Sequence, residues 1–367
     1  MEKSEAGKDK SQLKIDEMYM RRCLQLAENG RENAAPNPMV GAVIVHKGRI
    51  IGEGYHVRCG EGHAEVNAIA SVKDPSLFSE STVYVSLEPC SHYGKTPPCA
   101  DLIISKHIPR VVVGCVDPFA KVSGRGIRKL REAGIEVTVG VLEKECRALN
   151  CRFMTFQTHK RPYITLKWAE SADGFIDSNR PADSEPVRLS SSFTRMLVHK
   201  HRAENQAILV GRKTALLDDP NLTVRDWYGR NPVRLVIDPD CTLPAGLHLF
   251  DGSVPTVVFS DVDKLLAKAM DKSALKNVTF IGGDIRHNAL KSIFEYLYKN
   301  NVQSMLVEGG ANTLGRFIRS GEWDECFREV TDIELKEGIA APQLKDAELS
   351  DVQKVDGHYL FHYHKPH

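Results

Sequence analysis

One histidine and two cysteines have the residue types and the order of a zinc site. His63 precedes Ala64 and Glu65 in the segment HAE, Cys90 ends the segment EPC, and Cys99 follows after eight intervening residues. One imidazole and two thiolates leave a fourth tetrahedral position for water, the arrangement of catalytic rather than structural zinc. A zinc ion lowers the pKa of its bound water from about 15.7 to about 7. The three residues therefore predict a site that produces hydroxide at neutral pH.

Glu65 supplies a carboxylate that does not need to bind the metal. It lies two residues after His63, so both side chains can reach one cavity from the first turn of a helix. A carboxylate there can carry protons from the water to a ring nitrogen and a leaving amino group. His-x-Glu followed by Pro-Cys-x-x-Cys is typical of zinc deaminases, although eight residues separate the cysteines here. The alternatives, buried core residues or a structural zinc, leave Glu65 without a role.

The elements around these residues alternate between strands and helices. Predicted strands cover 40–46, 50–55, 82–87, 111–116 and 135–141, and predicted helices cover 16–28, 63–72, 99–106 and 127–133. This alternation predicts an α/β domain with helices on a central sheet. The histidine and the glutamate then begin a helix, and the first cysteine follows the end of a strand.

The residues between the two cysteines contain groups suited to a phosphorylated substrate. The insertion reads SHYGKTPP and places His92 and Lys95 between the two thiolates. A lysine can serve as a flexible point charge for a phosphate. A solvated surface loop would have the same composition, so the insertion by itself leaves both interpretations open.

Four segments of the first half form a wider pattern. They read APNPMVG at 35–41, GEGYH at 52–56, HAE at 63–65 and LEPCSHYGKTPPC at 87–99. Together they are similar to the bifunctional riboflavin-biosynthesis deaminase/reductase family. The long insertion between the cysteines resembles that family and differs from tRNA-adenosine and free-cytidine deaminases.

The resemblance implies a role for each matching residue of the first half. It implies that His63, Cys90 and Cys99 bind zinc and that Glu65 is the proton shuttle. The residues that match positions holding the pyrimidine and its ribose phosphate are Asn37, His56, His92 and Lys95. The implied fold is a cytidine-deaminase-like domain of three layers. The implied substrate is 2,5-diamino-6-ribosylamino-4(3H)-pyrimidinone 5′-phosphate, which loses ammonia.

The second half lacks the Gly-x-Gly-x-x-Gly fingerprint of dinucleotide binding after its first predicted strand. It has instead MLVEGGANTLG at 305–315, in which an apolar strand runs into a glycine turn and a helix. Glycines let the backbone approach a ligand, and the N–H groups at a helix start can hold phosphate. A packing turn between strand and helix would have the same pattern.

Other segments of this half resemble the reductase part of the same family. They read LKWAESADG at 166–174, VGRKT at 210–214, DDPNLTVR at 218–225 and EGG at 308–310. That part is similar to dihydrofolate reductase in fold and uses NADPH. The resemblance covers residues from about 16 to 323, while Pro186, Arg188, Asn205 and Gln206 depart from the family pattern.

The resemblance also implies the contacts of the reductase half. The residues implied to contact NADPH are Ala169, Thr214, Asp218, Gly310, Ala311, Asn312, Thr313, Leu314, Gly315 and Arg316. Those implied to contact substrate are Arg202, Leu222, Arg225 and Glu308, with the two arginines as phosphate partners. The implied reaction is hydride transfer to C1′ of the ring-opened ribosyl group of 5-amino-6-(5-phosphoribosylamino)uracil, which becomes ribityl. One alternative makes the second domain a non-catalytic nucleotide-binding module.

Length and charge limit the other classes of protein. The chain has 367 residues, 42% of them hydrophobic, which favours two domains. We expect a disordered tail over 1–14, a zinc-dependent deaminase domain over 15–157 and an NADPH-dependent reductase domain over 158–367. With 49 basic and 48 acidic residues, the chain lacks the basic excess that holds a nucleic acid. No apolar run reaches the length of a membrane span.

The remaining expectations concern compartment, assembly and the C-terminus. Nine cysteines without a secretion signal predict reduced thiols in a cytoplasm. The resemblance makes a homo-oligomer an expectation. His358, His362, His364 and His367 alternate in part with aromatic residues, which favours an exposed-face strand over a metal site.

Overall fold

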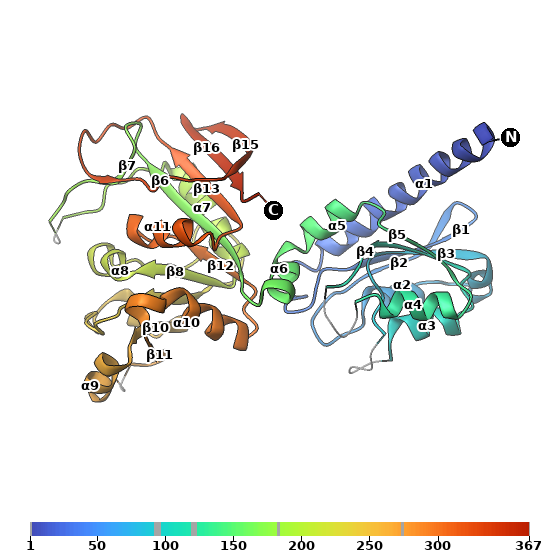
Figure 1. Cartoon of the computed structure of the whole chain (residues 1–367), viewed down its shortest axis with the longest axis horizontal. Coiled ribbons are helices and arrows are strands. Elements are labelled where there is room, and N and C mark those ends of the chain that lie inside the picture. Colours follow the sequence, from blue (N-terminus) through green and yellow to red (C-terminus); the bar gives the residue numbers. More distant parts are fainter. Residues whose placement is uncertain (1, 92–96, 119–122, 182–183, 273–274, 367) are drawn as a thin grey trace. The chain divides into compact units, whose positions relative to one another are not determined.

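The chain forms two compact units, Met1–His159 and Lys160–His367 (Figure 1). The computed structural model describes residues 2–91, 97–118, 123–181, 184–272 and 275–366. The predicted boundary between 157 and 158 lies two residues before this division. None of the helices among the described residues is long and apolar enough to cross a membrane.

The first unit has a five-stranded sheet in the order β2-β1-β3-β4-β5. Its strands are β1 (Gly41–His46), β2 (Arg49–Tyr55), β3 (Ser81–Leu87), β4 (Arg110–Cys115) and β5 (Glu136–Val139). Strand β1 pairs antiparallel with β2 and β3, whereas β3, β4 and β5 run parallel. The carboxyl end of β3 therefore lies at the edge where a parallel sheet commonly presents its functional loops.

Helices cover both faces of this sheet and make three layers. One face packs against α1 (Glu2–Glu28), α5 (Glu143–Leu149) and α6 (Cys151–His159). The other face packs against α2 (Ala64–Ala70), α3 (Cys99–Ser105) and α4 (Arg125–Glu132), and the short helix η1 (Pro75–Glu80) precedes β3. The three central strands, β1, β3 and β4, are almost fully buried because both faces are covered, as expected for an α/β domain. The predicted three-layer fold is confirmed.

Helix α1 begins at Glu2, where the sequence predicted a disordered tail over 1–14. Glutamate, lysine and alanine are good helix formers, so a charged segment can extend a helix that the core already anchors. That anchor is formed by Tyr19, Met20 and Cys23, which are buried against the sheet.

A buried ion pair fixes the middle of α1 to the sheet. The carboxylate of Asp16 accepts bonds of 3.0 and 2.8 Å from the guanidinium of Arg110 on β4, and a bond of 2.9 Å from the hydroxyl of Tyr84 on β3. Burial raises the pKa of Asp16, but the hydrogen bonds from Arg110, Gln12 and Tyr84 outweigh burial and lower that pKa overall. Asp16 therefore contributes stability in its charged form.

The second unit has a nine-stranded sheet in the order β11-β10-β9-β8-β12-β6-β13-β16-β15. Its strands are β6 (Tyr163–Glu170), β8 (Ala207–Gly211), β9 (Val233–Ile237), β10 (Thr256–Asp261), β11 (Val278–Gly283), β12 (Ser304–Val307), β13 (Glu325–Val330), β15 (Glu348–Val355) and β16 (His358–His364). All neighbours from β11 to β13 are parallel, and the hairpin of β15 and β16 is antiparallel. Strands β7 (Phe175–Asp177) and β14 (Ile339–Ala340) form a separate pair.

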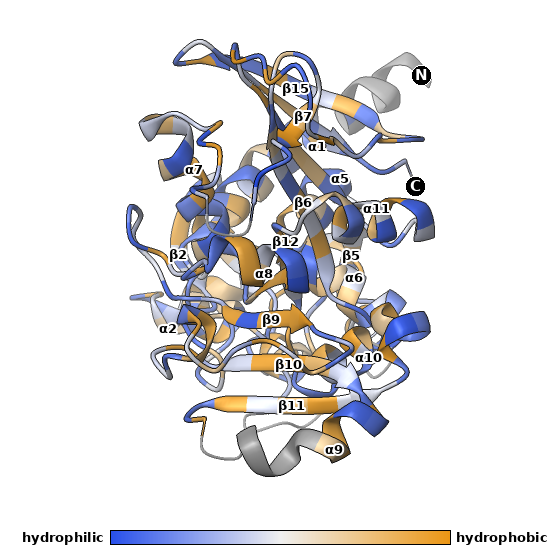
Figure 2. Cartoon of the chain, turned by 90° about the vertical axis from the view of Figure 1, so that its left-hand side faces the viewer, coloured by the Kyte–Doolittle hydropathy of each residue, from blue (hydrophilic) through white to orange (hydrophobic). Residues whose placement is uncertain are grey.

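Helices lie on both faces of this sheet as well. They are α7 (Ser192–Glu204), α8 (Arg212–Asp218), α9 (Val262–Lys272), α10 (Ile285–Lys299) and α11 (Ala311–Ser320), with the short helix η2 (His248–Phe250) after β9. One core lies between the sheet and α10 and α11, and a second core on the opposite face includes α8. Apolar stretches are visible along β9 and β10 in Figure 2. A mostly parallel sheet with an antiparallel C-terminal hairpin agrees with the reductase fold expected for this half.

Candidate active sites

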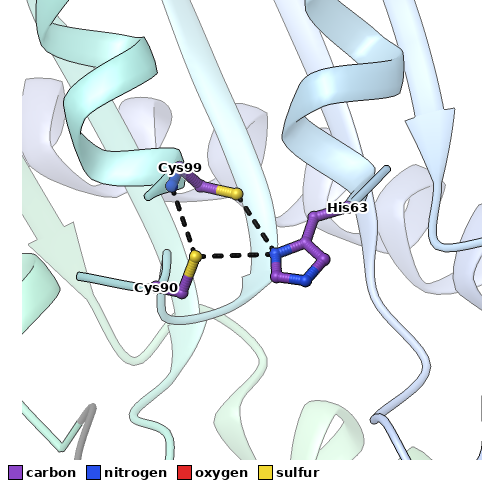
Figure 3. Close-up of side chains that lie close together, drawn as sticks. All are labelled: His63, Cys90 and Cys99. Carbon is purple, nitrogen blue, oxygen red and sulfur yellow. Dashed lines mark hydrogen bonds between the residues drawn. The ribbon is translucent and has the colours of Figure 1, made fainter. Parts of the chain in front are cut away.

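The three predicted zinc ligands converge from two helix starts and one strand end (Figure 3). His63 is the N-cap of α2, Cys99 is the first residue of α3, and Cys90 follows β3. The Nδ1 atom of His63 lies 3.5 Å from the Sγ of Cys90 and 3.3 Å from the Sγ of Cys99. All three donor atoms lie within 4.8 Å of one another. Zn–S bonds of about 2.3 Å and Zn–N bonds of about 2.0 Å fit donor atoms at such separations.

Of the two thiols, Cys90 has the protonation that suits a metal, whereas the hydrogen bond with Cys90 and burial raise the pKa of Cys99. Hydrogen bonds from Cys99 and then from His63 lower the pKa of the Cys90 thiol to about 4. The backbone N–H of Cys99 donates to the Cys90 sulfur over 3.3 Å. Thiolate is the form of cysteine that binds zinc. The donor set thus fits a zinc ion with one further coordination position.

Glu65 lies beside this triad and is almost completely buried, with 4% of its surface exposed. It is the second residue of α2, two positions after His63. Burial, followed by the nearby charge of Cys90, raises the pKa of Glu65 to about 7. A carboxyl group with a pKa near neutrality can both accept and return a proton at physiological pH. Glu65 thus has the position and the pKa that a proton shuttle requires.

Two of the four predicted substrate residues of this half lie next to the triad. The Nδ2 of Asn37 is 3.1 Å from the Nε2 of His56, and the Nδ1 of His56 is 3.1 Å from the carbonyl oxygen of Gly62. The rings of His56 and His63 meet edge to face with centroids 5.4 Å apart. Burial lowers the pKa of His56, so a neutral imidazole that donates through Nδ1 and accepts from Asn37 satisfies both bonds. The other two, His92 and Lys95, lie outside the described residues.

Helix α2 lies directly on strand β2 at a position where only glycine fits. A Cβ atom on Gly54 would lie 2.3 Å from the backbone nitrogen of Ala68 and 2.7 Å from the carbonyl oxygen of Ala64. Both neighbours are backbone atoms of α2 and cannot rotate away. Gly54 therefore sets the height of His63 and Glu65 above the sheet.

Glu88 anchors the chain beside the zinc site, a role that the sequence analysis missed. Its buried carboxylate accepts four backbone N–H groups: those of Asp117 at 3.3 Å, Gly124 at 2.9 Å, Gly126 at 2.9 Å and Ile127 at 3.3 Å. These bonds join the segment before Cys90 to the start of α4. The signal available in the sequence was a charged residue at the end of an otherwise apolar strand.

In the second unit, two predicted substrate residues form a bidentate ion pair. Nε and Nη2 of Arg202 on α7 donate to the carboxylate of Glu308 over 3.0 and 2.6 Å. The Nη1 of the same arginine donates to the carbonyl oxygen of Thr223 over 3.2 Å. Burial raises the pKa of Glu308, but the charge and hydrogen bonds of Arg202 outweigh it and lower that pKa. A charged pair that is largely desolvated in this way suits recognition of a polar ligand.

Most of the predicted cofactor residues lie at or just after the glycine turn that follows β12. The N–H of Gly310, the N-cap of α11, donates to the hydroxyl of Thr214 on α8 over 3.0 Å. A Cβ atom on Gly211 would lie 2.4 Å from the side chain of Thr313, and one on Gly309 would lie 2.7 Å from it. The glycine turn therefore packs against α8 and α11 without space for larger residues. Strand β6 carries Ala169 near its carboxyl end.

One buried polar atom of helix α11 fits an anionic cofactor. The Nη1 of Arg316 on α11 is buried without a hydrogen-bond partner among the described residues. A buried guanidinium nitrogen without a partner is costly, so a phosphate oxygen would be a suitable acceptor. The residues present therefore fit a nucleotide cofactor.

The three remaining predicted residues of the second unit have different surroundings: one lies in the core, one is exposed and one is in an ion pair. Leu222 has 2% of its surface exposed and its side chain belongs to the core on the α8 face, so it can meet a ligand mainly through its backbone. Arg225 is exposed and donates to the hydroxyl of Thr223 over 3.0 Å. The carboxylate of Asp218 pairs with Arg180.

Lys167 on β6 is a second residue to which the sequence analysis gave no role. Its ammonium lies 3.7 Å from a carboxylate oxygen of Glu329, and its side chain is 13% exposed. It lines a cavity of about 210 Å³ together with His201 on α7, Phe327 on β13 and His362 on β16. The motif LKWAESADG contained this lysine, but its spacing did not show which face of the strand it would occupy.

Family models match both units. The model "Cytidine and deoxycytidylate deaminase zinc-binding region" matches residues 13–115, and the model "RibD C-terminal domain" matches residues 162–327. The first match contains the triad and Glu65, and the second contains the Arg202–Glu308 pair. The protein is thus a zinc-binding deaminase joined in one chain to a reductase.

Relatives of similar length identify the family. The chain is 38% identical over 343 residues to "Riboflavin biosynthesis protein RibD" of Aquifex aeolicus, which covers 93% of this chain and 94% of that protein. It is 36% identical over 330 residues to the protein of the same name from Escherichia coli, covering 85% and 86%. The chain belongs to the RibD family, the bifunctional deaminases and reductases of riboflavin biosynthesis.

A solved structure agrees with this over both units. The crystal structure of a diaminohydroxyphosphoribosylaminopyrimidine deaminase/5-amino-6-(5-phosphoribosylamino)uracil reductase from Thermotoga maritima matches with a TM-score of 0.83 and 34% sequence identity. The match covers 97% of this chain and 100% of that one. The resemblance inferred from the sequence segments is confirmed.

Proposed function

We propose that this chain deaminates 2,5-diamino-6-ribosylamino-4(3H)-pyrimidinone 5′-phosphate and then reduces the ribosyl group of 5-amino-6-(5-phosphoribosylamino)uracil with NADPH. The observation that carries the proposal is the convergence of His63, Cys90 and Cys99 beside the buried carboxyl of Glu65. The name of the Thermotoga maritima relative, which describes these two activities, supports the same assignment.

In the deaminase half, we assign the chain's own residues to binding and proton transfer. A zinc ion held by the triad would supply a water of lowered pKa. Glu65 would take a proton from that water, deliver it to a ring nitrogen and assist the departing amino group. The pyrimidine and its ribose phosphate would be held by Asn37, His56, His92 and Lys95.

In the reductase half, the chain would position two reactants. NADPH supplies the hydride, so the protein has to hold the nicotinamide and C1′ at near-attack distance. Thr214, the turn at Gly310 and the buried Nη1 of Arg316 support binding of the cofactor here. Arg202 and Glu308, locked together by two hydrogen bonds, would orient the polar groups of the substrate, with Arg225 at its phosphate.

A coupled assay on the full chain tests both halves. The pyrimidinone phosphate is supplied with and without NADPH, while ammonia release and the absorbance of NADPH are followed. We expect ammonia in both cases, and consumption of NADPH only after deamination. Ammonia release without any loss of NADPH would refute the reductase assignment and favour a nucleotide-binding module. NADH in place of NADPH tests the choice of cofactor.

Replacement of Glu65 tests its role as proton shuttle. The E65Q variant should keep its zinc, because Glu65 is not one of the ligands, and lose about 10²–10⁴-fold in deaminase turnover. The matched control is E17Q, since the side chain of Glu17 is 30% exposed and pairs with Arg21 within helix α1 over 3.1 Å. Normal turnover in E65Q would remove Glu65 from the mechanism, and loss of zinc would show that it supports the metal instead.

The same proposal places the enzyme in the cytoplasm. Cys90 and Cys99 have to stay reduced to bind zinc, which a reducing compartment favours. Assembly into a homo-oligomer stays a prediction, which sedimentation of the purified chain would test.

A further inference from the structure

The C-terminal hairpin brings a second group of metal-binding side chains together, in the reductase unit. Strands β13 and β16 are antiparallel, with Glu325 opposite His364 and Phe327 opposite His362. Residues opposite one another point to the same face, and so do residues two apart on one strand. Glu325, His362 and His364 therefore share one face of the sheet.

Distances within this group match a mononuclear metal site. The Nε2 of His362 lies 3.3 Å from an oxygen of Glu325, and the rings of His362 and His364 have centroids 4.4 Å apart. One ligand atom from each of the three residues lies within 4.8 Å of the other two. Metal bonds of about 2.0–2.2 Å in a tetrahedral site place neighbouring ligand atoms roughly 3.4 Å apart. The three side chains therefore need only small rotations to close on one ion.

Neighbouring residues orient two of these ligands. The hydroxyl of Thr165 on β6 donates to Oε1 of Glu325 over 2.7 Å, while the other oxygen, Oε2, faces His362. The ring of His362 stacks on Phe327, with centroids 4.2 Å apart and an angle of 12° between the planes. Fixing a carboxylate by a hydrogen bond and an imidazole by packing is how outer residues prepare a metal site.

The third strand of this region adds negative charge. Glu348 on β15 lies opposite His364, and a bulge between Leu349 and Asp351 brings Asp351 opposite His362. Each histidine thus has an acidic residue opposite it on β15 and shares its face with Glu325. Three carboxylates around two imidazoles favour a divalent cation over an anion or a neutral ligand.

We propose that Glu325, His362 and His364 form a second metal site, for a divalent transition cation such as zinc. Two imidazoles and one carboxylate are a ligand set for zinc and its first-row neighbours, and calcium and magnesium prefer oxygen ligands. The sequence favoured an exposed-face strand over a metal site here. The strand is confirmed as β16, but its partner Glu325, 37 positions before His362, supplies the ligand that the C-terminal segment lacked. The site ties β16 to β13 beside the cavity that His362 lines.

Metal titration of the full chain tests this proposal independently of catalysis. The protein is loaded with one equivalent of zinc per chain and then titrated with Co²⁺, whose spectrum reports its ligands. We expect a second equivalent to bind with the weak visible bands of nitrogen and oxygen ligands and without the intense thiolate absorption of a cysteine site. The variant H362A/H364A should retain the first equivalent and lose the second, with affinity falling at least about tenfold for each ligand removed.

Controls separate this site from surface binding and from misfolding. The variant H287A removes an exposed histidine of α10 and should still bind the second equivalent. The single variant H364Q keeps a polar side chain on the strand and should weaken the second equivalent without changing the circular dichroism spectrum. A wild-type chain that takes up one equivalent only, or a second equivalent that persists unchanged in H362A/H364A or H364Q, would overturn the proposal.

Discussion

Replacement of Glu88 by glutamine is the sharpest test of how the zinc site is held. The carboxylate accepts two N–H groups on each oxygen: Gly126 and Ile127 on Oε1, and Asp117 and Gly124 on Oε2. An amide has one oxygen, so its NH₂ group has to face two of these donors, whichever way it is flipped. Each hydrogen bond to a charged acceptor contributes about 1.5–3 kcal/mol. The variant E88Q should therefore lose about 3–6 kcal/mol of unfolding free energy in the first unit.

The tryptophans provide an internal control for this measurement. The chain has three, Trp168, Trp227 and Trp323, and all lie in the second unit. Tryptophan fluorescence then follows the reductase unit, while far-ultraviolet circular dichroism follows both units. During urea unfolding of zinc-loaded E88Q, the dichroism transition of the first unit should move to lower urea and the fluorescence transition should stay in place. Zinc should also leave at lower urea than in the wild type.

A matched glutamate shows whether the effect is specific. Glu53 pairs with Arg22 at the surface over 2.7 Å, with both side chains partly exposed, and E53Q should cost about 1 kcal/mol or less. If E88Q unfolded within about 1 kcal/mol of the wild type, the four bonds would contribute little and the anchoring role of Glu88 would be wrong.

Three further predictions concern other contacts. D16N should lower the stability of the first unit by about 3 kcal/mol at neutral pH. The folded-state pKa of Asp16 is lowered, so its contribution to stability is present above the unfolded-state pKa and is lost as pH falls through the folded-state pKa. The melting temperatures of D16N and the wild type should therefore converge in acid. A difference in melting temperature that stays constant with pH would contradict the pairing with Arg110. R202K cannot make the bidentate bond to Glu308, so kcat/KM of the reductase should fall about ten- to a hundredfold while ammonia release is unchanged. G54A should push α2 off the sheet, with about 1–3 kcal/mol lost and weaker retention of zinc against a chelator.

The convergence of three metal-binding side chains beside Glu65 could be predicted because the chemistry restricts both residue type and position. A three-ligand zinc site needs imidazole and thiolates at the ends of elements, and His63, Cys90 and Cys99 stand at two helix starts and after a strand. Local patterns of strands and helices were sufficient to predict two α/β units. Both inferences depend on short stretches of sequence.

Long-range partners could not be predicted in the same way. The N–H groups that bind Glu88 lie 29 or more residues beyond it, in a segment whose path the local sequence does not determine. A resemblance transferred Leu222 as a position but did not show that its side chain enters the core. The charged start of α1 had the composition of a tail, and it continues a helix whose later turns are anchored by packing against the sheet.

The position of β15 has a consequence for self-association of the protein. It is the outermost strand of the nine-stranded sheet, so one of its edges offers backbone groups to any further strand. Its exposed residues include Glu348, Asp351 and Lys354, and the bulge near Asp351 interrupts its regular pairing. Charged side chains and bulges on edge strands oppose the addition of strands from other molecules. The same acidic residues that surround the paired histidines thus also protect this edge of the sheet from aggregation.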